Sequence, residues 1–379
     1  MRRGVFFLFL VVMTCVGLGQ TRRPNPAEVI VSAEQEEFLR QSRDAVLQGE
    51  MDEALRLATR AVMADQTNFV GYHFRGELND RLRRFDAAVL DFGMGYQYAP
   101  HRLDLLRMRA RAQFKAGRLQ DAISDWKLFV ERQQDASQAP YLFTLGIAQA
   151  IVGDNEAARK QFEWYDVVQS NDAEAAAWHF LTVARHSGLG AARERMLEVS
   201  EEEKRIPMMQ VYSMFKGELR PGRVLAAARS GEPTEKELAR AMFYANLYLG
   251  IFYEATGEPG LARLYLRRAE EAKEFGDMTL DYMREVARVF GDEMERREAV
   301  AMEAEMASSP EHAAVMKWRK RSIAAGIGVL LWLGIRLYPW VRQWQPQRGR
   351  RRNELVEDST KDRLEREPEL VAAGEEGST

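Results

Sequence analysis

Three basic residues lie at a helical spacing in the first half of the chain. Arg107, Arg111 and Lys115 follow one another at intervals of four residues, which places them along one side of an α-helix. Guanidinium groups bind carboxylates through paired hydrogen bonds, so such a strip could hold an acidic peptide or a chain terminus. The alternative is a solvated face neutralised by the neighbouring acids Glu77 and Asp80, and the residues leave both interpretations open.

No pattern typical of a catalytic centre accompanies this strip. The sequence lacks a GxSxG elbow, a phosphate-binding loop and an HExxH zinc motif. Its five histidines show no ligand spacing, and Cys15 is the one cysteine, so neither an internal disulfide nor a Cys/His metal cluster can form. The formal net charge of −3 over 379 residues does not indicate nucleic-acid binding. We therefore expect no enzyme, metal site or cofactor, and a protein or peptide as the partner.

The helix that carries the strip belongs to a repeating unit. Small residues recur at steps of 34, 34 and 36 residues, at Ala54, Ala88, Ala122 and Ala158. A large aromatic follows four residues after the last three, at Phe92, Trp126 and Phe162. A second small residue precedes each alanine by twelve positions, at Ser42, Gly76, Ala110 and Gly146. This period and order are typical of tetratricopeptide repeats, in which small residues let paired helices approach closely.

The expected fold is therefore an all-α solenoid over residues 33–275, with about seven helical hairpins. Two hairpins are degenerate, because the pattern weakens between residues 173 and 230 and recovers around Ala262. Glycine stands at the turn inside most hairpins, as at Gly49, Gly117 and Gly153, where it ends a helix in the left-handed conformation. The second repeat has Arg83 at this turn.

Solenoids of this kind present a concave groove to a partner, which would lie there as a helix or an extended segment. The repeat register places several residues of each first helix on that surface. The candidate groove residues are Arg43, His73, Glu77, Arg81, Arg107, Arg111, Phe114, Lys115, Phe143 and Ile147. The apolar members Phe143 and Ile147, together with Ile151, belong either to the groove surface or to the core.

Both ends of the chain predict export and membrane attachment. Residues 1–19 combine Arg2 and Arg3 with a short apolar run and small residues, the pattern of a cleaved signal peptide. An uncleaved anchor is one alternative, and a lipoprotein modified at Cys15 is another, although Met13 and Thr14 fit a lipobox badly.

Residues 322–341 are apolar apart from Arg336 and long enough to cross a bilayer, for which about 20 residues suffice. A charged helical connector is expected over residues 276–316 and a disordered charged tail over residues 342–379. The alternative for the apolar segment is a buried or surface-lying amphipathic helix. With the signal peptide, the segment predicts repeats in the periplasm and a tail in the cytoplasm.

One stretch resembles a known family. Residues 243–269, which read FYANLYLGIFYEATGEPGLARLYLRRA, resemble the terminal repeat of the NlpI family of bacterial periplasmic tetratricopeptide lipoproteins. The irregular middle, with Trp178 and residues 209–222, is similar as well, so the resemblance covers roughly residues 33–290. The chain departs from that family in its poor lipobox and in its apolar C-terminal segment.

The resemblance implies an adaptor that docks cell-wall endopeptidases and a tail-specific protease. We therefore expect a membrane-tethered protein-binding scaffold of the bacterial envelope, which binds its partner in the concave groove. The alternative is a structural subunit or assembly factor of a membrane complex.

Overall fold

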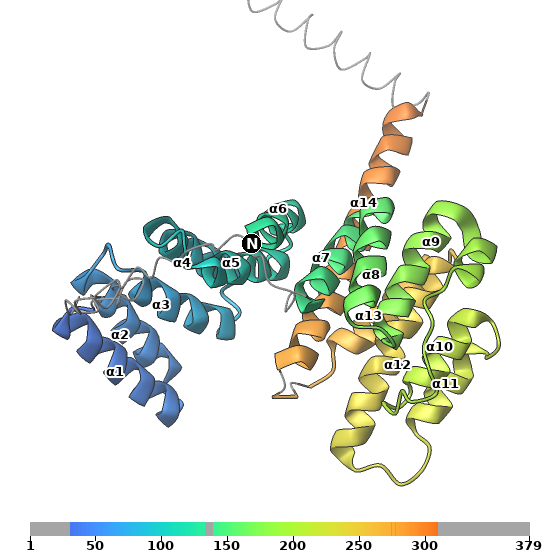
Figure 1. The fold of residues 1–379 in the computed structure, drawn as a ribbon, viewed down its shortest axis with the longest axis horizontal. Coiled ribbons are helices and arrows are strands. Elements are labelled where there is room, and N and C mark those ends of the chain that lie inside the picture. The colour runs from blue at the N-terminus through green and yellow to red at the C-terminus, as the bar shows by residue number, and fades with distance from the viewer. Residues whose placement is uncertain (1–30, 133–138, 274, 277, 310–379) are drawn as a thin grey trace, which may run out of the picture. The chain divides into compact units, whose positions relative to one another are not determined.

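The computed structural model describes residues 31–132, 139–273, 275–276 and 278–309, and each regular element in these ranges is an α-helix (Figure 1). The chain divides into two compact units, residues 1–297 and residues 298–379, and each is considered by itself. All contacts discussed below lie within the first unit.

The first eight helices form four consecutive hairpins, as the 34-residue period predicts. They are α1 (Ala33–Gln48) with α2 (Met51–Ala64), α3 (Phe69–Arg81) with α4 (Phe85–Tyr98), α5 (Leu103–Lys115) with α6 (Leu119–Arg132), and α7 (Ala139–Val152) with α8 (Asn155–Val168). The most extensive backbone contacts are those within each hairpin, and each hairpin also packs on the next one along the chain. The expectation of an all-α repeat is confirmed over this region.

The remaining helices are less regular. They are α9 (Ala173–Glu194), α10 (Met208–Lys216), α11 (Pro221–Ala228), α12 (Glu235–Ala255), α13 (Pro259–Glu270) and α14 (Met278–Ser308). Helix α9 bends sharply at Gly188, which has φ 88° and ψ 166°, so its two arms take the place of one hairpin. Short α10 and α11 take the place of the next, and α12 with α13 restores the regular pattern.

Small residues facing large side chains hold the hairpins together. The four alanines of the repeat, Ala54, Ala88, Ala122 and Ala158, are fully buried. A Cβ atom added to Gly76 would lie 2.7 Å from the ring of Phe92, and one added to Gly146 would lie 2.8 Å from the ring of Phe162. Each of these small residues thus faces the large side chain sixteen positions later in its own hairpin, and this contact sets how closely the two helices approach.

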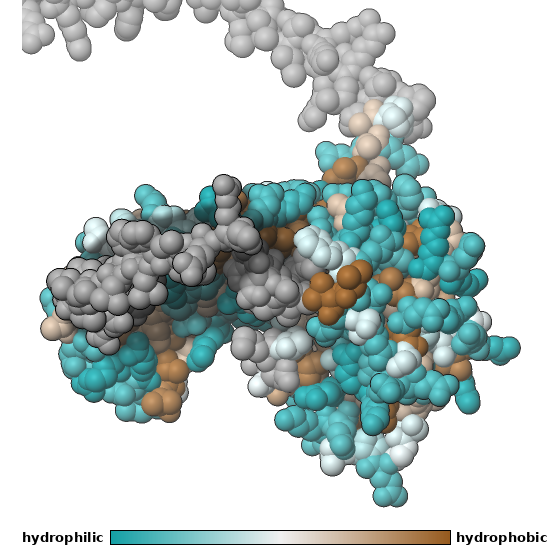
Figure 2. Space-filling view, viewed as in Figure 1, coloured by the Kyte–Doolittle hydropathy of each residue, from teal (hydrophilic) through white to brown (hydrophobic). Residues whose placement is uncertain are grey.

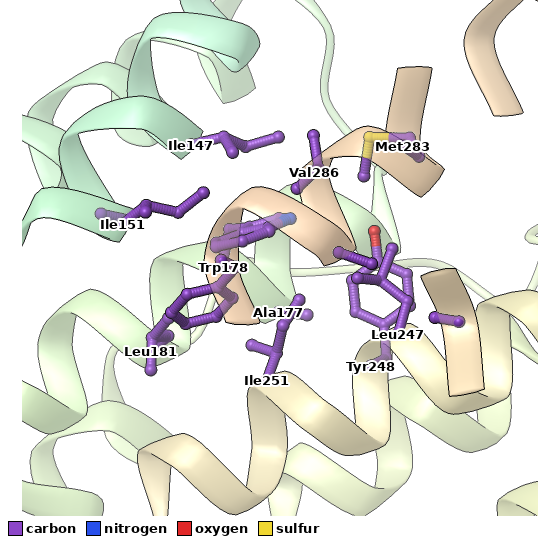
Figure 3. Packing of buried hydrophobic residues seen from close by; sticks show 14 of the residues in the cluster. Ile147, Ile151, Ala177, Trp178, Leu181, Leu247, Tyr248, Ile251, Met283 and Val286 are labelled. Atoms are coloured by element: carbon purple, nitrogen blue, oxygen red, sulfur yellow. The ribbon is translucent and has the colours of Figure 1, made fainter. Parts of the chain in front are cut away.

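The largest core lies where four helices that are distant in sequence meet (Figure 3). Its members come from all the helices from α5 to α14, and those at the meeting of α7, α9, α12 and the first part of α14 include Ile147, Ile151, Trp178, Leu181, Leu247, Tyr248, Ile251, Met283 and Val286. Trp178 lies among them, fully buried. The last described helix therefore contributes to the same core as the middle repeats.

The turns between paired helices take the conformation that the sequence predicts. Gly49, Gly117 and Gly153 have φ values of 80°, 75° and 87°, which glycine adopts without a steric penalty. Arg83 occupies the equivalent position with φ 57°, a conformation that costs an L-residue with a side chain about 1–2 kcal/mol. Its guanidinium group forms an ion pair with Glu285 of α14. This turn therefore combines a strained backbone conformation with a side-chain contact to a helix that is distant in sequence.

The predicted transmembrane helix is corrected by the structure. Among the helices of the described residues, none combines the length and the apolar character needed to cross a membrane. The longest of them, α14, has 31 residues, but acidic and basic side chains recur along it. Residues 322–341, the signal-peptide region 1–19 and Cys15 all lie outside the described residues. The membrane helix, the periplasmic location and the membrane anchor are therefore not retained.

The close hairpin contact can be tested at a buried glycine. Replacing Gly146→Ala should lower the free energy of unfolding by about 1–3 kcal/mol, because the new methyl group collides with Phe162. Gly291→Ala is the matched control, since a Cβ at this helical site meets nothing within 4 Å and alanine favours the helix by up to about 1 kcal/mol. Urea unfolding measures both, and equal stabilisation by the two substitutions would contradict the packing.

The strained turn can be tested at Arg83. Both Arg83→Gly and Arg83→Ala remove the ion pair with Glu285, but only glycine also removes the steric cost of a positive φ. The glycine variant should therefore be more stable than the alanine variant by about 1–2 kcal/mol in urea unfolding. If the two variants unfold at the same urea concentration and with the same dependence of the unfolding free energy on urea, the turn carries no strain.

Candidate partner-binding groove

The predicted basic strip lies on α5, but its members are already engaged. Lys115 Nζ donates to the carboxylate of Asp80 on α3 at 2.6 and 2.9 Å, and the lysine side chain is only 11% exposed. Burial lowers the pKa of Lys115, and the charge of Asp80 partly opposes this shift. The guanidinium carbon of Arg111 lies 5.3 Å from the ring centre of Tyr282 on α14. The strip therefore holds neighbouring parts of this chain together, while Arg107 on the same helix is half-buried.

The apolar candidates belong to the core. Phe114 and Ile147 are fully buried, as is Ile151. The ring of Phe114 lies 5.9 Å from that of Trp126 and 5.6 Å from that of Tyr282. Phe143 is half-buried and packs against Phe162, with ring centres 6.0 Å apart. Of the two interpretations that the sequence left open for the apolar residues, the structure supports core packing.

The first part of α14, residues 278–297, covers the inner surface of the middle repeats. Besides the contact of Tyr282 with Phe114, the ring of Phe290 lies 5.6 Å from that of Trp178 on α9. Val286, next to Ile147 and Trp178 in Figure 3, is fully buried. We call the surfaces of α5, α7, α9 and α12 that pack against residues 278–297 the covered inner face. Part of the predicted groove is thus filled by the chain itself.

Polar contacts fix α14 at several points along this surface. Arg83 donates to both carboxylate oxygens of Glu285, and Arg288 donates to the backbone carbonyl of Lys115. Further along, Arg297 lies 3.6 Å from Glu254 of α12. Charge-assisted bonds of this kind fix the register of a helix as well as adding stability.

Polar side chains on the inner surface of the first two hairpins are exposed or half-buried. Arg43 is exposed on α1, with its guanidinium carbon 5.5 Å from the ring centre of Phe74 on α3. His73 Nε2 lies 3.8 Å from Glu77 Oε1 one turn later, and Arg81 at the end of α3 is exposed. We call this set the open inner face. Four of the ten predicted groove residues, Arg43, His73, Glu77 and Arg81, belong to it.

The packing of α14 on this site was not predicted from the sequence. The residues it missed are Tyr282, Glu285 and Phe290, which lie within the segment expected to be a charged connector. A signal was present, because apolar residues recur every three or four positions at 282, 283, 286, 289, 290 and 294. This is the spacing of a helix with one buried face.

A second cluster of charged groups lies away from α14, where α9 begins. The guanidinium group of Arg205 contacts three carboxylates, with distances of 2.5 Å to Glu174, 2.6 Å to Glu203 and 3.2 Å to Asp172. The hydroxyl of Tyr248 on α12 donates to the other oxygen of Glu174 at 2.6 Å. Burial, followed by the charge of Asp172, raises the pKa of Glu174 from 4.5 to about 7. Burial thus leaves Glu174 partly protonated near pH 7, although the charge of Arg205 opposes this shift.

No metal site accompanies these charges. In the ranges that the structure describes, no three His, Cys, Asp or Glu side chains are placed to hold a metal ion together.

On the outside, exposed apolar side chains gather on α8, where Trp164 is 52% and Val167 84% exposed. Figure 2 shows apolar residues in small separate patches on a mostly hydrophilic face. Scattered patches of this size are normal for a globular surface.

Solved helical-repeat structures resemble the chain at low identity. No protein-family model and no curated protein matches it. A tetratricopeptide repeat protein from Parabacteroides merdae is 16% identical, with 68% of this chain and 99% of that one covered and a TM-score of 0.44. YrrB, described as a TPR protein with an unusual peptide-binding site, is 16% identical, with 50% and 94% covered and a TM-score of 0.39. PilW, described as a type IV pilus biogenesis factor, is 12% identical, with 66% and 99% covered and a TM-score of 0.39. The more specific resemblance to the NlpI family stays a prediction.

The protonation of Glu174 predicts a pH dependence of stability. Because its folded pKa lies above the unfolded value, the folded state gains stability by binding a proton. This contribution is fully present below about pH 4.5 and is lost as pH rises through 7, with a size on the order of 3 kcal/mol. Glu174→Gln keeps a neutral side chain at all pH values, so urea unfolding of this variant should lose less stability between pH 5 and about 8 than the wild type.

Glu34→Gln, an exposed change on α1, is the control and should follow the wild-type pH profile. If Glu174→Gln follows that profile too, Glu174 is ionised in the folded protein throughout this range.

Proposed function

We propose that the protein is a non-enzymatic scaffold that binds a segment of a partner protein on its open inner face. One observation carries this proposal: the same surface, further along the array, already packs against a helical segment. The first helices of successive hairpins line both parts, and residues 278–297 cover only the later one. A surface built in this way fits a polypeptide better than a small molecule.

The open inner face has a chemistry that favours acidic segments. Arg43 and Arg81 are exposed cations, and Phe74 between the first two hairpins is half-buried beneath the Arg43 guanidinium group. An arginine stacked on an aromatic ring keeps its N–H groups available at the edges, where a carboxylate can bind in bidentate fashion. His73 and Glu77 supply a mixed polar surface beside them, so the expected ligand carries acidic and apolar residues together.

The resemblance of residues 243–269 to the NlpI family would make the partners cell-wall hydrolases or proteases. This narrower assignment is a proposal that rests on that resemblance alone. The repeat architecture and the open inner face are compatible with many other protein partners.

Site-specific photo-crosslinking tests the scaffold function. Arg81→p-benzoylphenylalanine places a crosslinker on the open inner face, and Arg56→p-benzoylphenylalanine places one on α2, at an exposed site that pairs with Glu53 of its own helix. In cells that express the protein, the Arg81 position should give a discrete adduct with another protein and the Arg56 position should not. Adding Arg43→Glu should reduce the Arg81 adduct severalfold, because it reverses the cation beside the ligand.

Two outcomes would contradict the proposal. Equal adducts from Arg81 and Arg56 would indicate collisions at the surface, and an Arg81 adduct that Arg43→Glu leaves unchanged would place the ligand elsewhere. Circular dichroism of the purified variants checks that the helices are retained.

A further inference from the structure

Helix α14 contacts the repeats differently from the way the hairpin helices contact each other. Within a hairpin, backbones approach closely over alanine and glycine. Residues 278–297 reach the covered inner face through large side chains, chiefly Tyr282, Met283 and Phe290, and the smaller Val286 and Ala287 are buried with them. Because α14 follows the last hairpin and is not part of one, it can leave without separating the two helices of any hairpin.

The fit of α14 is also imperfect. The hydroxyl of Tyr282 is buried and has no hydrogen-bond partner, and the surrounding apolar groups raise the pKa of this phenol, since burial is the largest cause. A buried polar atom without a partner weakens binding, and a phenylalanine at this position would not carry that penalty. The surface thus accepts an aromatic ring here but does not satisfy its hydroxyl group.

The ion pairs that hold α14 lie at a water-accessible edge. A hollow of about 280 Å³ borders Arg83 and Glu285, together with Glu270, Arg284 and Arg288. The Arg83 side chain is 47% exposed whereas that of Glu285 is 6% exposed, so solvent and competing carboxylates can reach the Arg83 guanidinium group. Without α14, the edge of the covered inner face would present Arg83 and Arg111 as cations beside the apolar surface of Phe114 and Trp178.

We propose that residues 278–297 are an internal ligand of the covered inner face, and that an amphipathic helix of a partner protein replaces them. That helix carries an aromatic residue, a glutamate three positions later and a second aromatic eight positions after the first, which repeats the pattern of Tyr282, Glu285 and Phe290. Phenylalanine at the first position binds more tightly than tyrosine. This inference rests on the proposed scaffold function and adds a second, regulated part to its binding surface.

Hydrogen exchange on the wild-type protein tests whether α14 opens. Backbone amides of residues 278–297 should exchange through a local opening, while those of α9 and α12 stay protected at the same denaturant concentration. If the amides of α14 exchange only together with those of α9 and α12, at the free energy of global unfolding, α14 is a permanent part of the core and the proposal is wrong.

A peptide of residues 278–297 tests whether the surface accepts a helix from outside. The labelled peptide should bind the variant Glu285→Arg about tenfold more tightly than the wild type, because the repulsion from Arg83 weakens the internal helix. Adding Arg83→Glu restores the internal pair and should return the affinity to the wild-type level. A peptide with Tyr282→Phe should bind the Glu285→Arg variant more tightly than the unmodified peptide, and a scrambled peptide should not bind.

A folded Glu285→Arg variant that binds the peptide no better than the wild type would overturn the proposal. If this variant does not fold, the hydrogen-exchange measurement on the wild type still shows whether α14 opens separately from the core. Neither experiment uses an external partner, so their failure would leave the crosslinking result at Arg81 unaffected, and the reverse holds as well.

Discussion

The contact between a small residue and a large side chain inside a hairpin is the constraint on which the rest depends. Gly76 against Phe92 and Gly146 against Phe162 leave no room even for a methyl group, so the spacing of the paired helices is fixed. The same contact recurs at Gly250 against Leu266, and each hairpin packs on the next one along the chain. An inner surface follows from this stacking, whatever the chain binds there.

That inner surface is used in two ways. Its later part, around Trp178, is large and apolar, and it would be costly to leave exposed to water. Residues 278–297 cover it, and Arg83 at a strained turn provides one of the ion pairs that position them. Its earlier part carries Arg43 and Arg81, charged side chains that need no cover. The division between a covered and an open surface thus follows the polarity of the side chains along the array.

Much of this architecture can be predicted from the sequence because it depends on local spacing. The 34-residue period, the left-handed turn glycines and the pairing of Ala122 with Trp126 on one helical face all come from residues close together along the chain. The position of α14 could not be found in this way, since Arg83 and Glu285 are 202 residues apart and the apolar residues of α14 alternate with charged ones. For the same reason Phe114 and Lys115 were expected to face a partner, whereas they contact Tyr282 and Asp80.

The central claim is that residues 278–297 pack on the inner surface of the repeats, and a double-mutant cycle measures this most directly. Phe114→Leu and Tyr282→Leu each remove one ring of a pair whose centres are 5.6 Å apart. Their effects on the free energy of unfolding should be coupled by about 0.5–1.5 kcal/mol, as for other aromatic pairs in contact. Effects that add to within about 0.3 kcal/mol would show that the two rings do not touch, and would contradict the placement of α14 on the groove.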